Sequence, residues 1–154
     1  MGGLKICAEY GIRFDALLKK EQLYQLEVIC REIPSLKIVI DHAAKPDIAG
    51  DGFCDWVPLI SKAAELPVLC KISGLLTEAD HKEWTEKDIQ PYVDELLRIF
   101  GTERLMFGSD WPVSTMAADY DLSVKTIQHL LQSCSSEERE NLLFKNAKEF
   151  YGIE

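Results

Sequence analysis

Asp110 and His42 are the two residues whose type and position in this sequence best suit chemistry. Asp110 comes just after the apolar run 104–107 and before Trp111, where a carboxylate could act as a general base or a metal ligand. His42 comes just after the apolar run 36–40, where an imidazole could bind a metal, polarise a carbonyl group or hydrogen-bond a substrate. Both residues are therefore candidate catalytic groups and candidate metal ligands.

Lys71 and Ser73 follow a third apolar run, 67–70. The Lys71 ammonium could bind an anionic or polyhydroxylated substrate, and if burial lowered its pKa the amine could act as a base instead. Ser73 places a small hydroxyl beside the flexible backbone of Gly74, which is useful near a ligand. We expect both residues to bind substrate.

Each of these residues also has an ordinary structural interpretation. An aspartate between a strand and a helix often caps the helix, a lone histidine is more often structural, and a lysine at a strand end can extend into solvent. Ser-Gly pairs are equally common in turns. The sequence contains no G-x-S-x-G elbow, P-loop or H-E-x-x-H helix that would favour another catalytic class.

The candidate residues lie at the ends of short apolar runs that we predict to be β-strands. Such runs are apolar on both faces, as in a parallel sheet covered by helices. The four predicted strands cover residues 12–18, 36–40, 67–70 and 104–107.

Apolar residues at helical spacing fill the segments between these strands. The predicted helices cover about 23–30, 56–64, 89–100 and 122–131, and a last one opens at a capping box formed by Ser135 and Glu138. Pro91 fits best in the first turn of helix 89–100, and Thr85 with Asp88 would cap a short turn before it.

The spacing of the strand ends indicates a βα-repeat fold. Asp15, His42, Lys71 and Asp110 follow one another at intervals of about thirty to forty residues, as in the βα units of a barrel. Four parallel units make half of an eight-stranded TIM-type barrel. A doubly wound open sheet that binds a nucleotide is the alternative, although no glycine-rich phosphate loop follows any strand. We treat residues 1–154 as a single domain.

The composition of the chain limits the kinds of molecule that it is expected to bind. The net charge of −9 argues against nucleic-acid and anionic-membrane surfaces, which require basic patches. No apolar run approaches the roughly 20 residues of a membrane span, and the start lacks a signal-peptide pattern. Five scattered cysteines are typical of buried thiols in a reducing compartment. We expect a cytoplasmic protein that acts on a small molecule.

Three segments carry a family resemblance: IVIDHAAKP at 38–46, CKISGL at 70–75 and LMFGSDWP at 105–112. Together they resemble the amidohydrolase-related family of metal-dependent hydrolases, in particular its lactonases, which include L-fuconolactonase and 2-pyrone-4,6-dicarboxylate lactonase. The likeness extends over nearly the whole chain, to the ending FYG at 150–152.

The resemblance implies the second half of the barrel and a role for each candidate residue. Asp110 matches the last-strand aspartate that activates the hydrolytic water, and His42 matches a mid-barrel histidine. Lys71, Trp111 and Ser73 would line the substrate pocket. The implied reaction is the opening of a lactone, such as a sugar lactone or a related cyclic ester, by general-base activation of water.

One departure from the family pattern affects the metal site. The family begins with an Asp-x-His-x-His motif on its first strand, and this sequence contains none. His42 and Asp110 would then be two metal ligands, whereas catalytic zinc usually has three protein ligands. Zinc, or another divalent metal, is thus expected of the complete family fold, and some lactonases of this group work without a metal.

Half a barrel also leaves two strand edges unpaired. Two copies could associate, a missing amino-terminal half could pair with this chain, or the chain is an incomplete isoform. The alternative to a lactone hydrolase is therefore a catalytically inactive half barrel that acts as a binding or assembly module.

Overall fold

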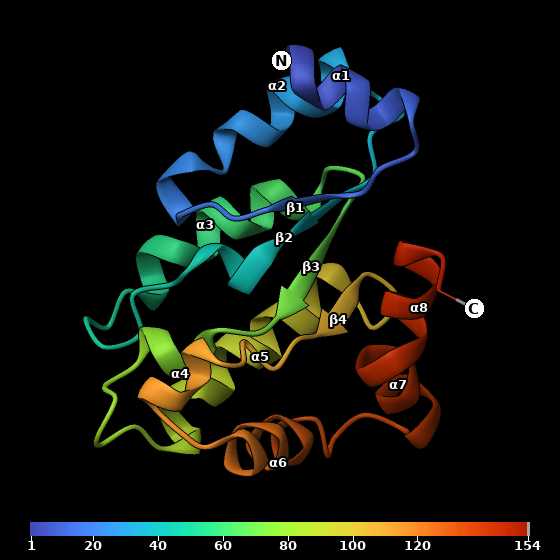
Figure 1. The fold of residues 1–154 in the computed structure, drawn as a ribbon. Coiled ribbons are helices and arrows are strands. Elements are labelled where there is room, and N and C mark those ends of the chain that lie inside the picture. Colours follow the sequence, from blue (N-terminus) through green and yellow to red (C-terminus); the bar gives the residue numbers. More distant parts are fainter. Residues whose placement is uncertain (154) are drawn as a thin grey trace.

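The computed structural model describes residues 1–153 and contains one sheet of four parallel strands (Figure 1). The strands are β1 (Phe14–Ala16), β2 (Ile38–Ile40), β3 (Val68–Ile72) and β4 (Leu105–Phe107). Each strand pairs with the next one along the chain, so the order in the sheet is β1-β2-β3-β4. A doubly wound sheet reverses its strand order at a switch point. The observed order has no reversal, which excludes that alternative and confirms the α/β fold with four parallel units.

Helices connect the strands, as the spacing of apolar residues predicts. The α-helices are α1 (Gly2–Glu9), α2 (Tyr24–Glu32), α3 (Phe53–Ala64), α4 (Leu75–Glu78), α5 (Glu86–Phe100), α6 (Tyr120–Leu130), α7 (Ser136–Glu140) and α8 (Asn146–Tyr151). Short 3₁₀ turns η1 (Lys20–Gln22), η2 (Asp41–Ala44) and η3 (Val113–Met116) and the π-turn η4 (Asn141–Lys145) lie between them. The sequence reasoning did not predict α1 or α4.

The two faces of the sheet have different coverings. Because side chains alternate along a strand, Ile38 and Ile40 of β2 point to one face and Val39 points to the other. The first face joins the main core, to which α3 and α5 contribute Trp56, Ile60, Ile89, Val93 and Leu96. On the second face Val39 and Met106 form a smaller cluster with Phe150 of α8. In a closed barrel this second face would line the interior.

The position of Pro91 differs from the prediction. Thr85 and Asp88 form a capping box that opens α5 itself, with the Thr85 backbone N–H donating to Asp88 Oδ2 over 2.7 Å. The helix therefore starts at Glu86, and Pro91 lies inside it rather than in its first turn. A proline there removes one backbone hydrogen bond, at a cost of about 3 kcal/mol. The buried apolar face of α5 offsets this cost.

The cysteines are less uniformly buried than predicted. Cys70 on β3 is buried, but Cys54 at the start of α3 is exposed, and the other three are intermediate. The Cys54 side chain lies on the solvent side of an amphipathic helix, which a count of apolar neighbours does not reveal. Within residues 1–153 no helix is long and apolar enough to cross a membrane.

Candidate active site

The chain leaves β2 through an unusual left-handed turn that carries His42. His42, Ala43, Ala44 and Lys45 have φ values of 50°, 48°, 59° and 53°, and none of them is glycine. Such residues cost about 1–3 kcal/mol each and persist where surrounding structure holds them. Here the indole N–H of buried Trp56 donates to the Ala43 carbonyl over 2.7 Å. The α3 helix therefore fixes the turn that presents His42.

The loop after β3 makes room for the His42 ring. Gly74 has φ +66°, and a Cβ atom at this position would lie 2.8 Å from Cβ, Cγ and Nδ1 of His42. Ser73, which is almost fully buried, places its Oγ 2.9 Å from His42 Nδ1. The Ser73-Gly74 pair thus positions the imidazole by one hydrogen bond and one close approach.

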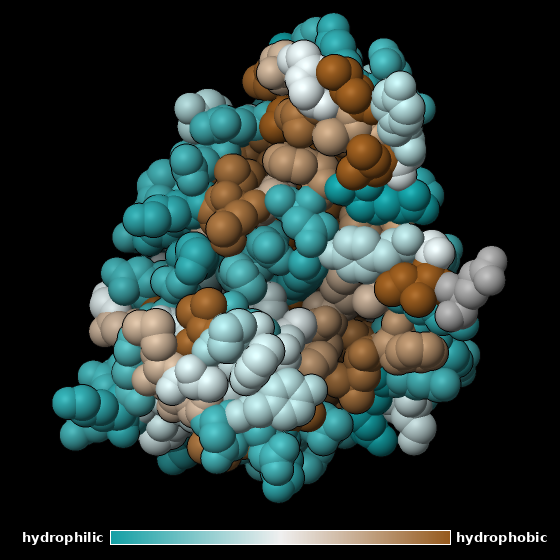
Figure 2. All heavy atoms as spheres, viewed as in Figure 1, coloured by the Kyte–Doolittle hydropathy of each residue, from teal (hydrophilic) through white to brown (hydrophobic). Residues whose placement is uncertain are grey.

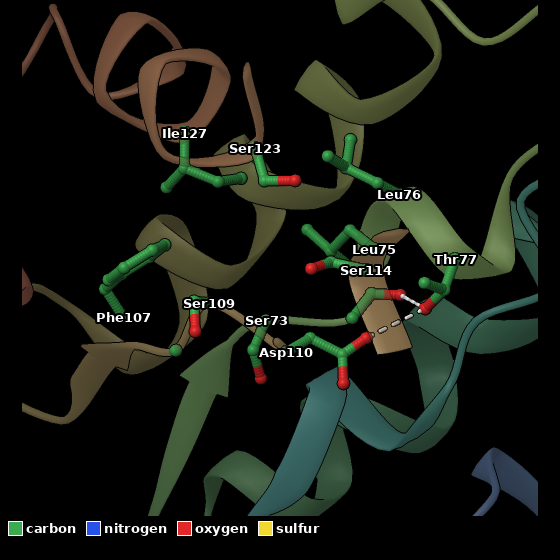
Figure 3. Close-up of a pocket in the computed structure, with 12 residues that line it drawn as sticks. Ser73, Leu75, Leu76, Thr77, Phe107, Ser109, Asp110, Ser114, Ser123 and Ile127 are labelled. Carbon is green, nitrogen blue, oxygen red and sulfur yellow. Dashed lines mark hydrogen bonds between the residues drawn. The ribbon is translucent and has the colours of Figure 1, made fainter. Parts of the chain in front are cut away.

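Asp110 faces the other nitrogen of His42. It lies beyond the end of β4, also with a positive φ of 56°, and its Oδ1 atom is 3.6 Å from His42 Nε2. Thr77 at the end of α4 donates its hydroxyl to Asp110 Oδ2 over 3.1 Å or to the Gly74 carbonyl over 2.8 Å (Figure 3). The side chains of Asp110 and His42 are 11% and 19% exposed, respectively. They are therefore sheltered but open to a ligand. At 3.6 Å the pair is too long for a hydrogen bond, and each group keeps bonding capacity for a reacting molecule.

Lys71 lies on the interior face of β3 in a network of charges. Its Nζ atom is 2.8 Å from Asp15 Oδ2 on β1 and 2.8 Å from Asp41 Oδ1 after β2. The Asp41 contact lacks the angle of a well-aligned hydrogen bond, so we describe it as an ion pair. Burial by itself lowers the pKa of Lys71, but the contacts with Asp15, Asp41 and Tyr151 outweigh burial and raise the pKa above its usual value. The amine therefore stays charged, which argues against a role as a base.

The carboxy-terminal helix reaches the same network. The Tyr151 hydroxyl donates to the Asp15 carboxylate, at 2.8 and 3.0 Å from its two oxygens, and the Tyr151 ring centroid is 5.7 Å from Lys71 Nζ. Asp41 Oδ2 lies 4.0 Å from His42 Nε2. A continuous set of polar groups thus runs from α8 to Asp110.

The structure brings most of the predicted site residues together. His42, Ser73 and Asp110 are adjacent, and Lys71 joins them through Asp41. Trp111 lies next to Asp110 in the chain but is 63% exposed, and its peptide bond to Pro112 is cis. No contact of its side chain with the other four residues supports its predicted place in the pocket, which remains a prediction.

The sequence reasoning missed four residues of this site: Asp15, Asp41, Thr77 and Tyr151. Asp15 and Asp41 had a signal, because Asp15 is the next-to-last residue of β1 and Asp41 directly follows β2. Tyr151 had none, since it is 136 residues away from its partner Asp15.

A small cavity lies behind Asp110, with Ser73, Thr77, Ser114 and Ser123 among the residues that line it (Figure 3). Its volume is about 20 Å³, enough for one water molecule. A larger hollow of about 420 Å³ lies at the other end of the strands, next to Pro67 and Phe150. Barrel enzymes work at the carboxyl ends of their strands, so we place the site at Asp110.

The donor set does not fit a complete zinc site. Within residues 1–153 no group of three His, Cys, Asp or Glu side chains is arranged to hold a metal ion. His42 and Asp110 offer two donors, and Asp41, the next carboxylate, is paired with Lys71. Catalytic zinc usually has three protein ligands. The predicted pair therefore provides at most part of a metal site.

The comparison with known proteins settles the family. The amidohydrolase family model matches residues 1–153. This chain belongs to the amidohydrolase family. An L-fucono-1,5-lactonase from Burkholderia ambifaria is 38% identical to this amidohydrolase chain in an alignment 151 residues long that covers 94% of the chain and 51% of that protein. An L-rhamnono-gamma-lactonase from Scheffersomyces stipitis is 27% identical in an alignment 148 residues long that covers 83% of this chain and 44% of that protein.

A solved structure agrees with these relatives. The zinc-bound crystal structure of an amidohydrolase from Burkholderia multivorans superimposes with a TM-score of 0.92 at 33% identity, over 99% of this chain and 56% of that one. The chain therefore spans about half the length of the amidohydrolases that it matches. This confirms the resemblance and the prediction that the fold is part of an amidohydrolase-type barrel.

Proposed function

We propose that this chain is the base-bearing half of a lactone hydrolase. The observation that carries the proposal is the approach of His42 Nε2 to Asp110 Oδ1, 3.6 Å apart at the carboxyl ends of two strands. Both residues have left-handed backbone conformations, which cluster at functional sites. The names of the lactonase relatives support the reaction class.

The proposed chemistry assigns one task to each residue. Asp110 accepts a proton from the water that attacks the lactone carbonyl carbon, while Thr77 holds the second carboxylate oxygen. With Ser73 donating to Nδ1, neutral His42 carries its proton on Nε2 and donates to the carbonyl oxygen as negative charge develops. The ring C–O bond then breaks, and the departing oxygen takes the proton from Asp110. The product is the open hydroxy acid.

A complete pocket requires four more strands. Among the residues that the structure describes, 1–153, β1 and β4 are the two edges of the sheet, and each pairs with one neighbour only. We infer that an amino-terminal half barrel, supplied by a longer form of this polypeptide or by another chain, pairs with both edges. The zinc of the Burkholderia multivorans neighbour suggests that such a half would also bring the missing metal ligands.

Acid release from L-fucono-1,5-lactone tests the proposal. The chain would be assayed alone and co-expressed with the amino-terminal half of the Burkholderia ambifaria lactonase. We expect Asp110→Asn to lower the rate by about 100-fold or more, because the base is lost. Asp121→Asn, an exposed residue on α6, is the matched control and should keep full activity. An Asp110→Asn protein that hydrolyses lactone normally would refute the assignment.

The second candidate is a non-catalytic assembly module. The same two open edges favour it, since unpaired parallel strands are ready to pair with another chain. Complementation distinguishes the candidates: a stable complex with no hydrolysis of any lactone would favour assembly alone.

A further inference from the structure

An ion pair joins the loops that follow β2 and β3, beside the candidate site. The Lys45 ammonium donates to Glu78 Oε1 over 2.6 Å, across 33 residues of the chain. Lys45 follows the turn η2, and Glu78 is the last residue of α4. The backbone makes a parallel connection, since the Ala49 N–H donates to the Glu78 carbonyl over 3.0 Å. The loop after β2 therefore lies against α4 (Figure 1).

The lysine end of this ion pair belongs to the turn that carries His42. Lys45 is the last of four consecutive residues with left-handed φ values, which begin at His42, and its own N–H donates to the His42 carbonyl over 2.7 Å. Non-glycine residues keep this conformation only where other contacts hold them. Trp56 holds the middle of the turn at Ala43, and Glu78 holds its end at Lys45.

The glutamate end of the ion pair is one residue from the group that holds Asp110. Thr77 precedes Glu78 in α4, and its hydroxyl lies 3.1 Å from Asp110 Oδ2 (Figure 3). Gly74, which closely approaches the His42 ring, is the residue before α4. Because α4 is a single helical turn, a shift at Glu78 is carried to both Thr77 and Gly74.

The ordinary interpretation of such an ion pair is a surface contact of little consequence. Solvent screens most exposed pairs, and their long side chains lose rotational freedom. The side chains of Lys45 and Glu78 are 33% and 24% exposed, so they are partly sheltered. The pair Lys145–Glu140 is 49% and 58% exposed and joins neighbouring turns of one helical stretch. It connects no separate loops and offers a matched control.

We propose that Lys45 and Glu78 are positioning residues, which hold the loops after β2 and β3 together and so keep His42 close to Asp110. They act through the left-handed turn and through α4. The contact of Ser73 with His42 shares this task, so loss of the ion pair should weaken the arrangement rather than abolish it. The kinetic part of this inference rests on the proposed function, whereas the contact between the loops can be measured without catalysis.

Hydrogen exchange measures how firmly the loops are held in the chain by itself. Lys45→Met and Glu78→Gln each remove one charge of the pair. Each should raise the exchange rate of the Ala49 backbone N–H about threefold or more, because this group bonds across the two loops. Lys145→Met should leave the rate unchanged. Thermal melts show that each variant is folded, and an unchanged rate in both variants of the pair would overturn the inference.

Lactone hydrolysis by the complemented barrel tests the positioning itself. Lys45→Met should lower kcat and kcat/KM equally, by about fivefold or more, because a residue that only positions the catalytic groups leaves substrate binding unchanged. A residue that lines the substrate pocket would raise KM instead. Lys45→Arg keeps a cation opposite Glu78 and should keep most of kcat, and Lys145→Met should keep all of it. The exchanged pair, Lys45→Glu with Glu78→Lys, should also recover most of the activity.

The two measurements separate this inference from the proposed function. If the wild-type complemented barrel hydrolyses no lactone, the proposed function fails, and the Ala49 exchange rate still decides whether the pair holds the loops. If the wild type is active and Lys45→Met has a normal kcat, the positioning role fails while lactone hydrolysis stands. A folded Lys45→Arg protein as slow as Lys45→Met would also count against the ion pair.

Discussion

Replacing Gly74 with alanine tests whether the loop after β3 positions His42. Two effects are expected from the structure. The positive φ of +66° costs an alanine about 1–2 kcal/mol, and the new methyl group would lie 2.8 Å from three atoms of His42. Contacts this short force side chains or backbone to shift, at a further cost of about 1–3 kcal/mol.

Gly11 provides a control that separates these effects. It has the same φ of +66°, but a Cβ atom there would have no neighbour within 4 Å. Gly11→Ala should therefore lower the free energy of unfolding by the backbone cost alone. Gly74→Ala should lower it by about 1–3 kcal/mol more than Gly11→Ala does.

Urea unfolding of the two variants measures this difference, and lactone hydrolysis by the complemented barrel reports its effect on the site. We expect Gly74→Ala to lose most activity because the His42 ring moves away from Ser73 and Asp110, and Gly11→Ala to keep it. Equal unfolding free energies and equal activities of the two variants would refute the positioning argument.

Two further predictions concern the elements that support the site. Trp56→Phe removes the indole donor to the Ala43 carbonyl. The free energy of unfolding should therefore fall by about 1–3 kcal/mol, and the rate of lactone hydrolysis should fall with it. Unaltered urea unfolding would contradict the role of α3 in holding the left-handed turn. Burial, followed by the nearby charges of Asp51, Asp47 and Cys54, raises the pKa of Tyr92 to about 12. The protonated phenol is thus favoured in the folded state, and its contribution to stability is complete below the usual pKa of 10.0 and lost as the pH rises toward about 12. Tyr92→Phe should flatten the fall of unfolding free energy across this range; an unchanged slope would show that Tyr92 does not titrate there.

The sequence alone was enough to predict the strands and most of the helices. Apolar runs such as 36–40 and 104–107 recur at βα spacing, and burial on both faces of a parallel sheet requires that pattern. Pro91 was misplaced because proline preference was weighed above the Thr85 capping box, which sets the start of the helix. The core packing of α5 allows the proline in its interior.

The sequence also indicated His42, Lys71, Ser73 and Asp110, since the carboxyl ends of parallel strands lie at the same end of a sheet. The sequence could not predict the distances between the side-chain atoms of these residues, and those distances determine the role that each residue can have. Whether Lys71 is a base or a fixed cation depends on Asp15 of β1 and on Asp41, which directly follows β2.

Only the tertiary structure decided how distant parts of the chain combine at the site. Tyr151 meets Asp15 across 136 residues, and Trp56 holds the turn of His42 from a separate helix. Local sequence determines strands and helices because it sets hydrophobic periodicity and capping. Contacts between side chains far apart in the chain depend on how those elements pack, and this packing placed the imidazole, the carboxylates and the ammonium within reach of one another.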